Sequence, residues 1–211
     1  MRRELLRISR LRAPWVVCLP FLGLTFAFGV LGGWMSRPGD VLEHDGGDYR
    51  FRYPARFELT HDTFEVATPD SRIVALRGAD GSLLMVHSFA PASNLSAQEF
   101  ADEIARQRRR ALLELGVQGG EVQHQIRERV RSAGALRDGV RQEFDIESGG
   151  LHFAQLARYV RVAVGDQELF VSLHTPARHA SRAESAFEEV LGSLEFAHPR
   201  AAANRSTRRD P

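Results

Sequence analysis

The chain contains no lysine, and its 28 basic residues are all arginine. The absence of lysine excludes Schiff-base chemistry and the phosphate-binding lysine of a P-loop. Cysteine is almost as scarce, because Cys18 is the only one in 211 residues. An intrachain disulfide is therefore impossible, and the rest of the chain has no thiol for catalysis or for a thiolate metal site.

Motifs that place catalytic or metal-binding groups together are also missing. The sequence has no GxSxG turn for a serine nucleophile and no HxH or HExxH pair of metal ligands. The eight histidines are scattered over separate expected loops, strands and the tail, which favours chance placement over a zinc site. We therefore expect no catalytic residues, no metal site and no cofactor.

The longest uncharged stretch runs from residue 13 to residue 35 and is expected to be a transmembrane helix. At about 1.5 Å per residue such a helix extends about 34 Å, enough to cross a hydrocarbon core of roughly 30 Å. Trp15 and Trp34 are the only tryptophans, and helical spacing would place one indole at each membrane interface. These two residues are the expected membrane anchors.

The charges on either side of the span predict its orientation. Five arginines and one glutamate lie in the head over residues 1–12, whereas residues 37–48 carry one arginine and four acidic residues. Positive residues stay in the cytoplasm, so we expect a single-pass protein of a bacterial inner membrane with its soluble part in the periplasm or outside the cell. A signal peptide cleaved at Ala27-Phe28-Gly29 is the alternative, although its apolar core would be unusually long.

Gly29 and Gly33 form a GxxxG pattern within the span. Such a pattern allows two membrane helices to approach closely, so a homodimer through the span is one interpretation. The general abundance of glycine in membrane helices is the other, and we favour it.

After the span the sequence predicts one soluble domain. Residues 36–48 are polar and rich in glycine and aspartate, which indicates a linker with order beginning at Tyr49. Residues 49–197 are long enough for a domain with its own core, and residues 198–211 are expected to be a disordered tail. The total charge of +1 includes +4 in the head, +1 at Arg37 and +3 in the tail, which leaves −7 for residues 40–198. Nucleic acid is therefore an unsuitable partner.

Alternation predicts short strands in the first half of the domain. Tyr49, Phe51 and Tyr53 alternate with arginines before Pro54, the pattern of a half-buried strand. Further strands are expected at 63–67, 72–77 and 83–89, in a meander with a glycine-containing turn before the last of them. Core packing is the favoured explanation for the three aromatic side chains, and a ligand cleft or a docking edge is the alternative.

A capping box from Ser96 to Glu99 predicts the start of a helix that ends at Gly116. Its arginines, including Arg108, are expected on a solvated face with intrahelical ion pairs. The opposite, apolar face is expected to contain Phe100, Ile104, Ala111, Leu112 and Leu115.

The second half returns to strands, at 122–131, 136–146, 151–164 and 167–174, the second being interrupted at Asp138-Gly139. A turn at Gly165-Asp166 would place Val162 opposite Leu169 and Val160 opposite Val171. Apolar residues also occur on the other face, at Phe153, Tyr159 and Phe170, with Val140, Phe144 and Ile146 expected alongside. A sheet that is apolar on both faces needs cover on both.

A second capping box, from Ser181 to Glu184, predicts the helix that supplies this cover, followed by a short strand over 194–196. The buried stripe of this helix is expected to be Ala183, Phe187, Val190, Leu191 and Leu194. The expected class is α+β, an antiparallel sheet between helices in an α/β/α sandwich, preceded by one transmembrane helix.

The order of these elements resembles the PsbP-like domain family, which includes the DcrB-type envelope proteins. The resemblance rests on Phe51-Arg52-Tyr53-Pro54, on Thr175-Pro176 and on the Leu-Gly-Ser-Leu-Glu-Phe segment over 191–196. It implies an antiparallel sheet between helices and members that mostly bind or assist other proteins at membranes without catalytic residues. We therefore expect a non-catalytic, membrane-anchored module that binds an envelope protein. The alternative is a small extracytoplasmic enzyme or ligand carrier whose cleft only the fold would assemble.

Overall fold

The computed structural model describes residues 40–60, 72–89, 92–165 and 167–197. The expected span with its two tryptophans and its GxxxG pattern, the expected strand at 63–67 and the tail lie outside the described residues. Among the residues that are described, no helix combines the length and the apolar character needed to cross a bilayer.

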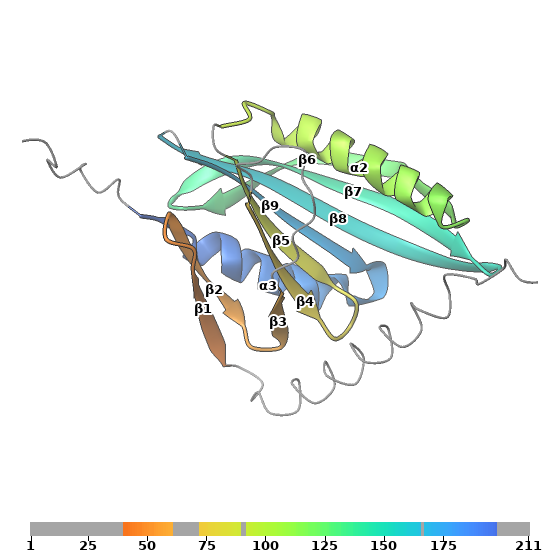
Figure 1. Ribbon diagram of the computed structural model, residues 1–211, viewed down its shortest axis with the longest axis horizontal. Coiled ribbons are helices and arrows are strands. Elements are labelled where there is room, and N and C mark those ends of the chain that lie inside the picture. Colours follow the sequence, from red (N-terminus) through yellow and green to blue (C-terminus); the bar gives the residue numbers. More distant parts are fainter. Residues whose placement is uncertain (1–39, 61–71, 90–91, 166, 198–211) are drawn as a thin grey trace, which may run out of the picture.

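An antiparallel sheet of seven strands forms the centre of the domain (Figure 1). From one edge to the other the strands are β3 (Phe57–Thr60), β4 (Arg72–Gly78), β5 (Leu83–Phe89), β9 (Gln167–Pro176), β8 (Leu151–Val164), β7 (Ala135–Ser148) and β6 (Gln118–Ser132). The expected register of the β8–β9 hairpin is confirmed, since Val160 lies opposite Val171 and Val162 opposite Leu169. Strand β3 has no counterpart among the expected strands.

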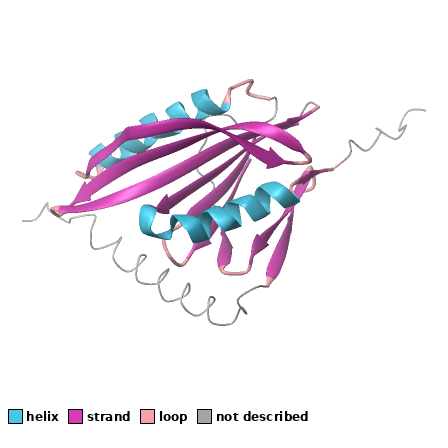
Figure 2. Cartoon of the chain, turned by 180° about the vertical axis from the view of Figure 1, so that it is seen from behind, coloured by secondary structure: helices cyan, strands magenta, loops and turns pink. Residues whose placement is uncertain are grey.

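Two helices cover the two faces of this sheet, α2 (Ala97–Glu114) on one and α3 (Ala180–Ser193) on the other (Figure 2). Phe100 of α2 packs on Phe144, Tyr159 and Phe170 of the sheet. On the opposite face the expected stripe of α3, from Ala183 to Leu194, is buried against the sheet. The α+β class and the α/β/α arrangement are confirmed.

A second sheet of three strands lies beside α3. It contains β1 (Val41–Asp45), β2 (Tyr49–Pro54) and the short β10 (Glu195–Phe196). The expected linker over 36–48 is therefore wrong from Val41 onward, because Val41 to Asp45 pair with β2. Most of β1 is exposed, so its sequence lacks the alternation that would reveal a strand. The expected meander is also wrong for β2, which pairs with β1 and β10 rather than with β4 or β5.

The two predicted capping boxes have different outcomes. At the start of α2, the amide of Glu99 donates to Ser96 Oγ at 3.1 Å, and the amide of Ser96 donates to Glu99 Oε2 at 2.8 Å. The box at Ser181 is wrong. A 3-10 turn, η1 (Ala177–His179), leads directly into α3, whose N-cap is His179 without a side-chain cap. Ser181 is therefore already inside the helix.

The last turn of α2 is less buried than its sequence predicts. Gly116 has a positive φ of 71° and ends the helix as expected. However, Leu115 is 71% exposed and Ala111 is also exposed, so the apolar face is covered only toward the start of the helix. Arg108 differs in the opposite direction: its side chain is expected on the solvated face of the helix, and it is partly buried.

Strand β7 continues through Asp138-Gly139, where an interruption was expected. A Cβ atom on Gly139 would lie 3.1 Å from Glu128 Cγ and 3.2 Å from the carbonyl oxygen of Tyr159. The glycine therefore allows close approach of the flanking strands rather than breaking the strand.

Candidate functional site

Strand β6 forms one edge of the described sheet, where its outer backbone groups have no neighbouring strand among the described residues. It is 15 residues long, whereas a typical strand has about 5–6 residues. Its pairing with β7 is irregular between Gly119 and His124, and from His124 to Ser132 the register is continuous. Open edges of this kind can accept an additional strand from another chain.

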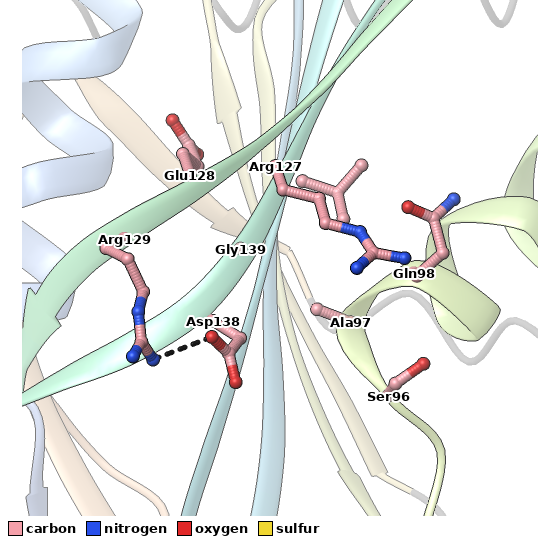
Figure 3. Close-up of a pocket in the computed structure, with 9 residues that line it drawn as sticks. Ser96, Ala97, Gln98, Arg127, Glu128, Arg129, Asp138 and Gly139 are labelled. Carbon is pink, nitrogen blue, oxygen red and sulfur yellow. Dashed lines mark hydrogen bonds and ion pairs between the residues drawn. The ribbon is translucent and has the colours of Figure 1, made fainter.

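A groove of about 500 Å³ lies along this edge, between β6 and β7 and the start of α2 (Figure 3). It is lined by Ser96, Ala97, Gln98, Arg127, Glu128, Arg129, Asp138, Gly139 and Val140. Figure 3 shows Arg127 pointing toward the start of α2, with Glu128 on the opposite side of β6. Most of the residues that line the groove are polar or charged, and they come from β6, β7 and the start of α2.

The arginines at this edge differ in their partners. Arg129 Nη1 donates to Asp138 Oδ1 of β7 at 2.7 Å. Arg127 and Arg131 are exposed, and neither forms an ion pair with any of the described residues. Two guanidinium groups without an ion-pair partner in the described part of the chain therefore lie along one edge of a domain whose overall charge is negative.

On the face covered by α3, the same strand carries a neutralised carboxylate. Glu128 accepts hydrogen bonds from Arg158 of β8, at 2.9 Å from Nε and 3.0 Å from Nη2. Arg158 is only 7% exposed, and it also lies 3.7 Å from Glu184 and 3.6 Å from Glu188 of α3. This network ties β6, β8 and α3 together and leaves Glu128 unavailable to an external cation.

A second group of polar side chains lies between α2 and the sheet. Five residues contribute polar atoms that find no hydrogen-bond partner among the described residues: Nε2 of His87, the hydroxyls of Tyr159 and Ser172, Nε2 of His174, and Nε and Nη1 of Arg108. The His174 and Tyr159 rings meet edge to face at 5.5 Å. The Arg108 guanidinium lies 3.5 Å above the Phe144 ring. We call these five residues the polar layer.

Burial dominates the protonation states of the polar layer. It lowers the pKa of His87 to about 4. Burial, together with the nearby positive charge of Arg108 and with His87, lowers the pKa of His174 to about 3. Burial also raises the pKa of Tyr159 to about 12, against the opposing effect of Arg108. Both imidazoles and the phenol are therefore neutral at neutral pH.

The sequence did not reveal that His87 and His174 face one layer, because the two residues are 87 positions apart in the chain and lie on different strands. A partial signal exists, since each histidine lies within a strand whose residues are mostly apolar and buried. No group of three or more metal-binding side chains occurs among the described residues. The layer thus offers hydrogen-bonding groups and one cation, without a cluster of ligands for a metal.

The three aromatic residues proposed from the sequence as a possible docking edge are buried. Tyr49, Phe51 and Tyr53 of β2 belong to the core cluster that contains α3. Phe51 contacts both tyrosine rings, at centroid distances of 6.3 Å and 6.1 Å. Core packing accounts for their position, and a docking role for them stays a prediction.

Exposed apolar side chains gather near the other end of α2. Leu113 and Leu115 lie at its C-terminal end. Leu151 and Phe153 of β8 lie on the face of the sheet that α2 covers, near the β7–β8 turn at the same end of the molecule (Figure 1). We call these four residues the apolar end. Exposed apolar residues that occur together often mark interaction sites.

No protein-family model matches the chain, and neither does any curated protein sequence. Solved structures do resemble it. One is PsbP of the cyanobacterium Synechocystis, with 16% identity and a TM-score of 0.46 over 74% of this chain and 92% of that one.

Two other similar structures come from yeast and from a bacterium. The Ran-binding protein Mog1p of Saccharomyces cerevisiae has 11% identity and a TM-score of 0.39, over 76% of this chain and 96% of that one. LpqN of Mycobacterium tuberculosis, described as involved in cell envelope biogenesis, has 10% identity and a TM-score of 0.34, over 76% and 93%.

Proposed function

We propose that this chain is a membrane-anchored, extracytoplasmic domain that binds a protein partner in the bacterial envelope and is not itself an enzyme. The observation that carries the proposal is the open edge of β6 with the groove beside it. Accessible strand edges are recurrent sites of protein recognition. By contrast, the groups with strongly shifted pKa values, where catalysis would be sought, are buried between α2 and the sheet.

The proposed anchor would hold the domain near the membrane. A span that ends at residue 35 leaves five residues before β1 begins at Val41, and five extended residues reach at most about 18 Å. A tether this short would hold the first strand of the domain close to the bilayer.

Reporter fusions test the topology. Alkaline phosphatase fused after residue 197 is expected to be active, and a reporter that functions only in the cytoplasm is expected to be inactive at the same position. The opposite pattern would refute the extracytoplasmic location.

Site-specific photocrosslinking in the native envelope tests partner binding. A crosslinker at Gln125 on β6 or at Leu113 at the apolar end is expected to capture the same protein repeatedly. A crosslinker at Ser185, an exposed residue of α3, is the control. Equal or absent capture at all three positions would contradict a protein-binding role.

A ligand carrier is the second candidate, because the polar layer contains buried polar atoms without partners and a guanidinium above an aromatic ring. Such groups would suit a small anionic molecule held between α2 and the sheet. Native mass spectrometry of the purified full-length chain tests this candidate. A bound small molecule that is lost in Arg108→Ala would favour it, and a mass equal to that of the polypeptide alone would count against it.

A further inference from the structure

The regular part of β6, residues 125–132, presents two chemically different faces. Arg127 lies opposite Val140, whose side chain is in the core beneath α2, so the arginines at 127, 129 and 131 lie on the α2 side. Val130 packs against the α3 core, and Ser132 Oγ donates to the carbonyl oxygen of Leu191 in α3 at 2.8 Å. Ile126, Glu128 and Val130 therefore lie on the α3 side.

The charges on these two faces are unequal. On the α2 side, Asp138 neutralises Arg129, while Arg127 and Arg131 have no ion-pair partner among the described residues. On the α3 side, Arg158 neutralises Glu128. What remains on that side is apolar, with Ile126 43% exposed and Val130 partly exposed. A strand added to this edge would meet positive charge on one face and apolar side chains on the other.

We propose that the edge of β6 over residues 125–132 binds an extended segment of a protein partner in which acidic side chains alternate with apolar ones. Main-chain hydrogen bonds to the open edge would supply affinity. Carboxylates beside Arg127 and Arg131, and apolar side chains beside Ile126 and Val130, would supply register and specificity. This inference rests on the proposed protein-binding function and identifies the chemistry of the partner.

A second copy of this chain fits the edge less well. If two β6 strands paired edge to edge in an antiparallel manner, both α2 sides would lie on the same face of the joined sheet. Arginines 127, 129 and 131 of each copy would then share one surface, where like charges repel. The charge pattern therefore favours an acidic strand over self-association.

Peptide binding to the purified full-length chain in mild detergent tests the proposal. The probes are two fluorescent six-residue peptides, one alternating Glu and Val and the other alternating Lys and Val, each flanked by Gly-Ser. In fluorescence anisotropy the Glu peptide is expected to bind at least about tenfold more tightly than the Lys peptide. Equal affinities would overturn the proposal.

Charge reversal locates the site. The double variant Arg127→Glu/Arg131→Glu is expected to weaken binding of the Glu peptide at least about tenfold and to improve binding of the Lys peptide. The control, Arg110→Glu/Arg178→Glu, makes the same change in net charge at two other exposed positions and is expected to retain the preference. Similar thermal melts of both variants would show that the fold is retained. Loss of the preference in both variants would show nonspecific electrostatic attraction and would overturn the proposal.

The backbone contribution is tested separately. A Glu-Val peptide that is N-methylated at alternate residues lacks the amide donors along one of its two edges. Binding is expected to be lost when the methylated edge is the one that faces β6. Two such peptides, methylated at the odd or at the even positions, cover both registers. Unchanged affinity for both would exclude strand addition.

Crosslinking separates failure of this inference from failure of the proposed function. Capture of a partner at Leu113, without capture at Gln125 and without preference for the Glu peptide, would overturn the β6 site and retain protein binding. No capture at either position would overturn both. A crosslink from Gln125 to a second copy of the chain would replace the acidic strand with self-association.

Discussion

Arg158 of β8 and Glu128 of β6 form a two-point ion pair that passes over the intervening strand β7. Its two hydrogen bonds measure 2.9 Å and 3.0 Å. Gly139 is the residue of β7 that lies opposite Glu128, and its missing side chain leaves room for the glutamate. The same pair positions the edge strand and neutralises the only carboxylate in its regular part.

The first prediction concerns the stability that this pair provides. Glu128→Gln would leave the buried Arg158 without its main counterion, although Glu184 and Glu188 remain within 4 Å. We expect a loss of about 2 kcal/mol in unfolding free energy, below the roughly 3–5 kcal/mol of a completely broken buried pair. Urea unfolding followed by circular dichroism measures this loss. Glu195→Gln, at an exposed pair with Arg50, is the control and should have a much smaller effect.

The second prediction concerns the contact between β7 and its neighbours. A methyl group at Gly139 would lie 3.1–3.2 Å from Glu128, Tyr159 and Val160, so these neighbours must shift slightly to admit it. Gly139→Ala is expected to lower the unfolding free energy by about 1–3 kcal/mol. Gly192→Ala is the matched control, because its Cβ would meet no atom within 4 Å inside α3. That variant should be neutral or more stable by up to about 1 kcal/mol, and an equal effect at the two positions would contradict this explanation.

The third prediction concerns stability in acid. Burial lowers the pKa of His87 to about 4 and that of His174 to about 3, whereas an unfolded histidine titrates near about 6.5. The unfolded state therefore binds protons first as the pH falls below about 6.5, and stability decreases. With about 1.4 kcal/mol for each pH unit, each histidine should cost about 2 kcal/mol by pH 5.

Equilibrium unfolding at several pH values between 8 and 5 tests this slope. The double variant His87→Phe/His174→Phe should lose most of the pH dependence, since neither position can then take up a proton. His152→Phe should retain it, because that side chain is 71% exposed. If the unfolding free energy falls with pH equally in the unaltered protein and in both variants, other groups govern the acid response.

The fourth prediction compares two serines with the same sequence pattern. Ser96 caps α2, and Ser181 lies within the first turn of α3 without capping it. Ser96→Ala is expected to cost about 1 kcal/mol. Ser181→Ala removes no cap and should leave stability unchanged or slightly higher. Comparable losses in thermal or urea unfolding would indicate that the start of α3 differs from the one described.

Local patterns explain how much of the fold could be predicted. The β8–β9 register follows from the short turn after Val164, and the cap of α2 follows from four consecutive residues. The buried stripe of α3 follows from helical periodicity. These features depend on residues close together in the chain, so the sequence alone is sufficient for them. The same reasoning was wrong at Ser181, because the preceding 3-10 turn moved the start of the helix.

Composition and periodicity thus determined the class of the protein: a sheet apolar on both faces, two helices to cover it, and a chain without lysine or a usable thiol. Only the tertiary structure decided which strand became the edge, that β2 pairs with β1 and β10, and that His87 and His174 share one layer. The pairing of β5 with β9 joins segments that have 77 residues between them, and no local pattern encodes such a contact. The candidate site depends on these long-range pairings, because an edge exists only once every other strand has found its neighbours.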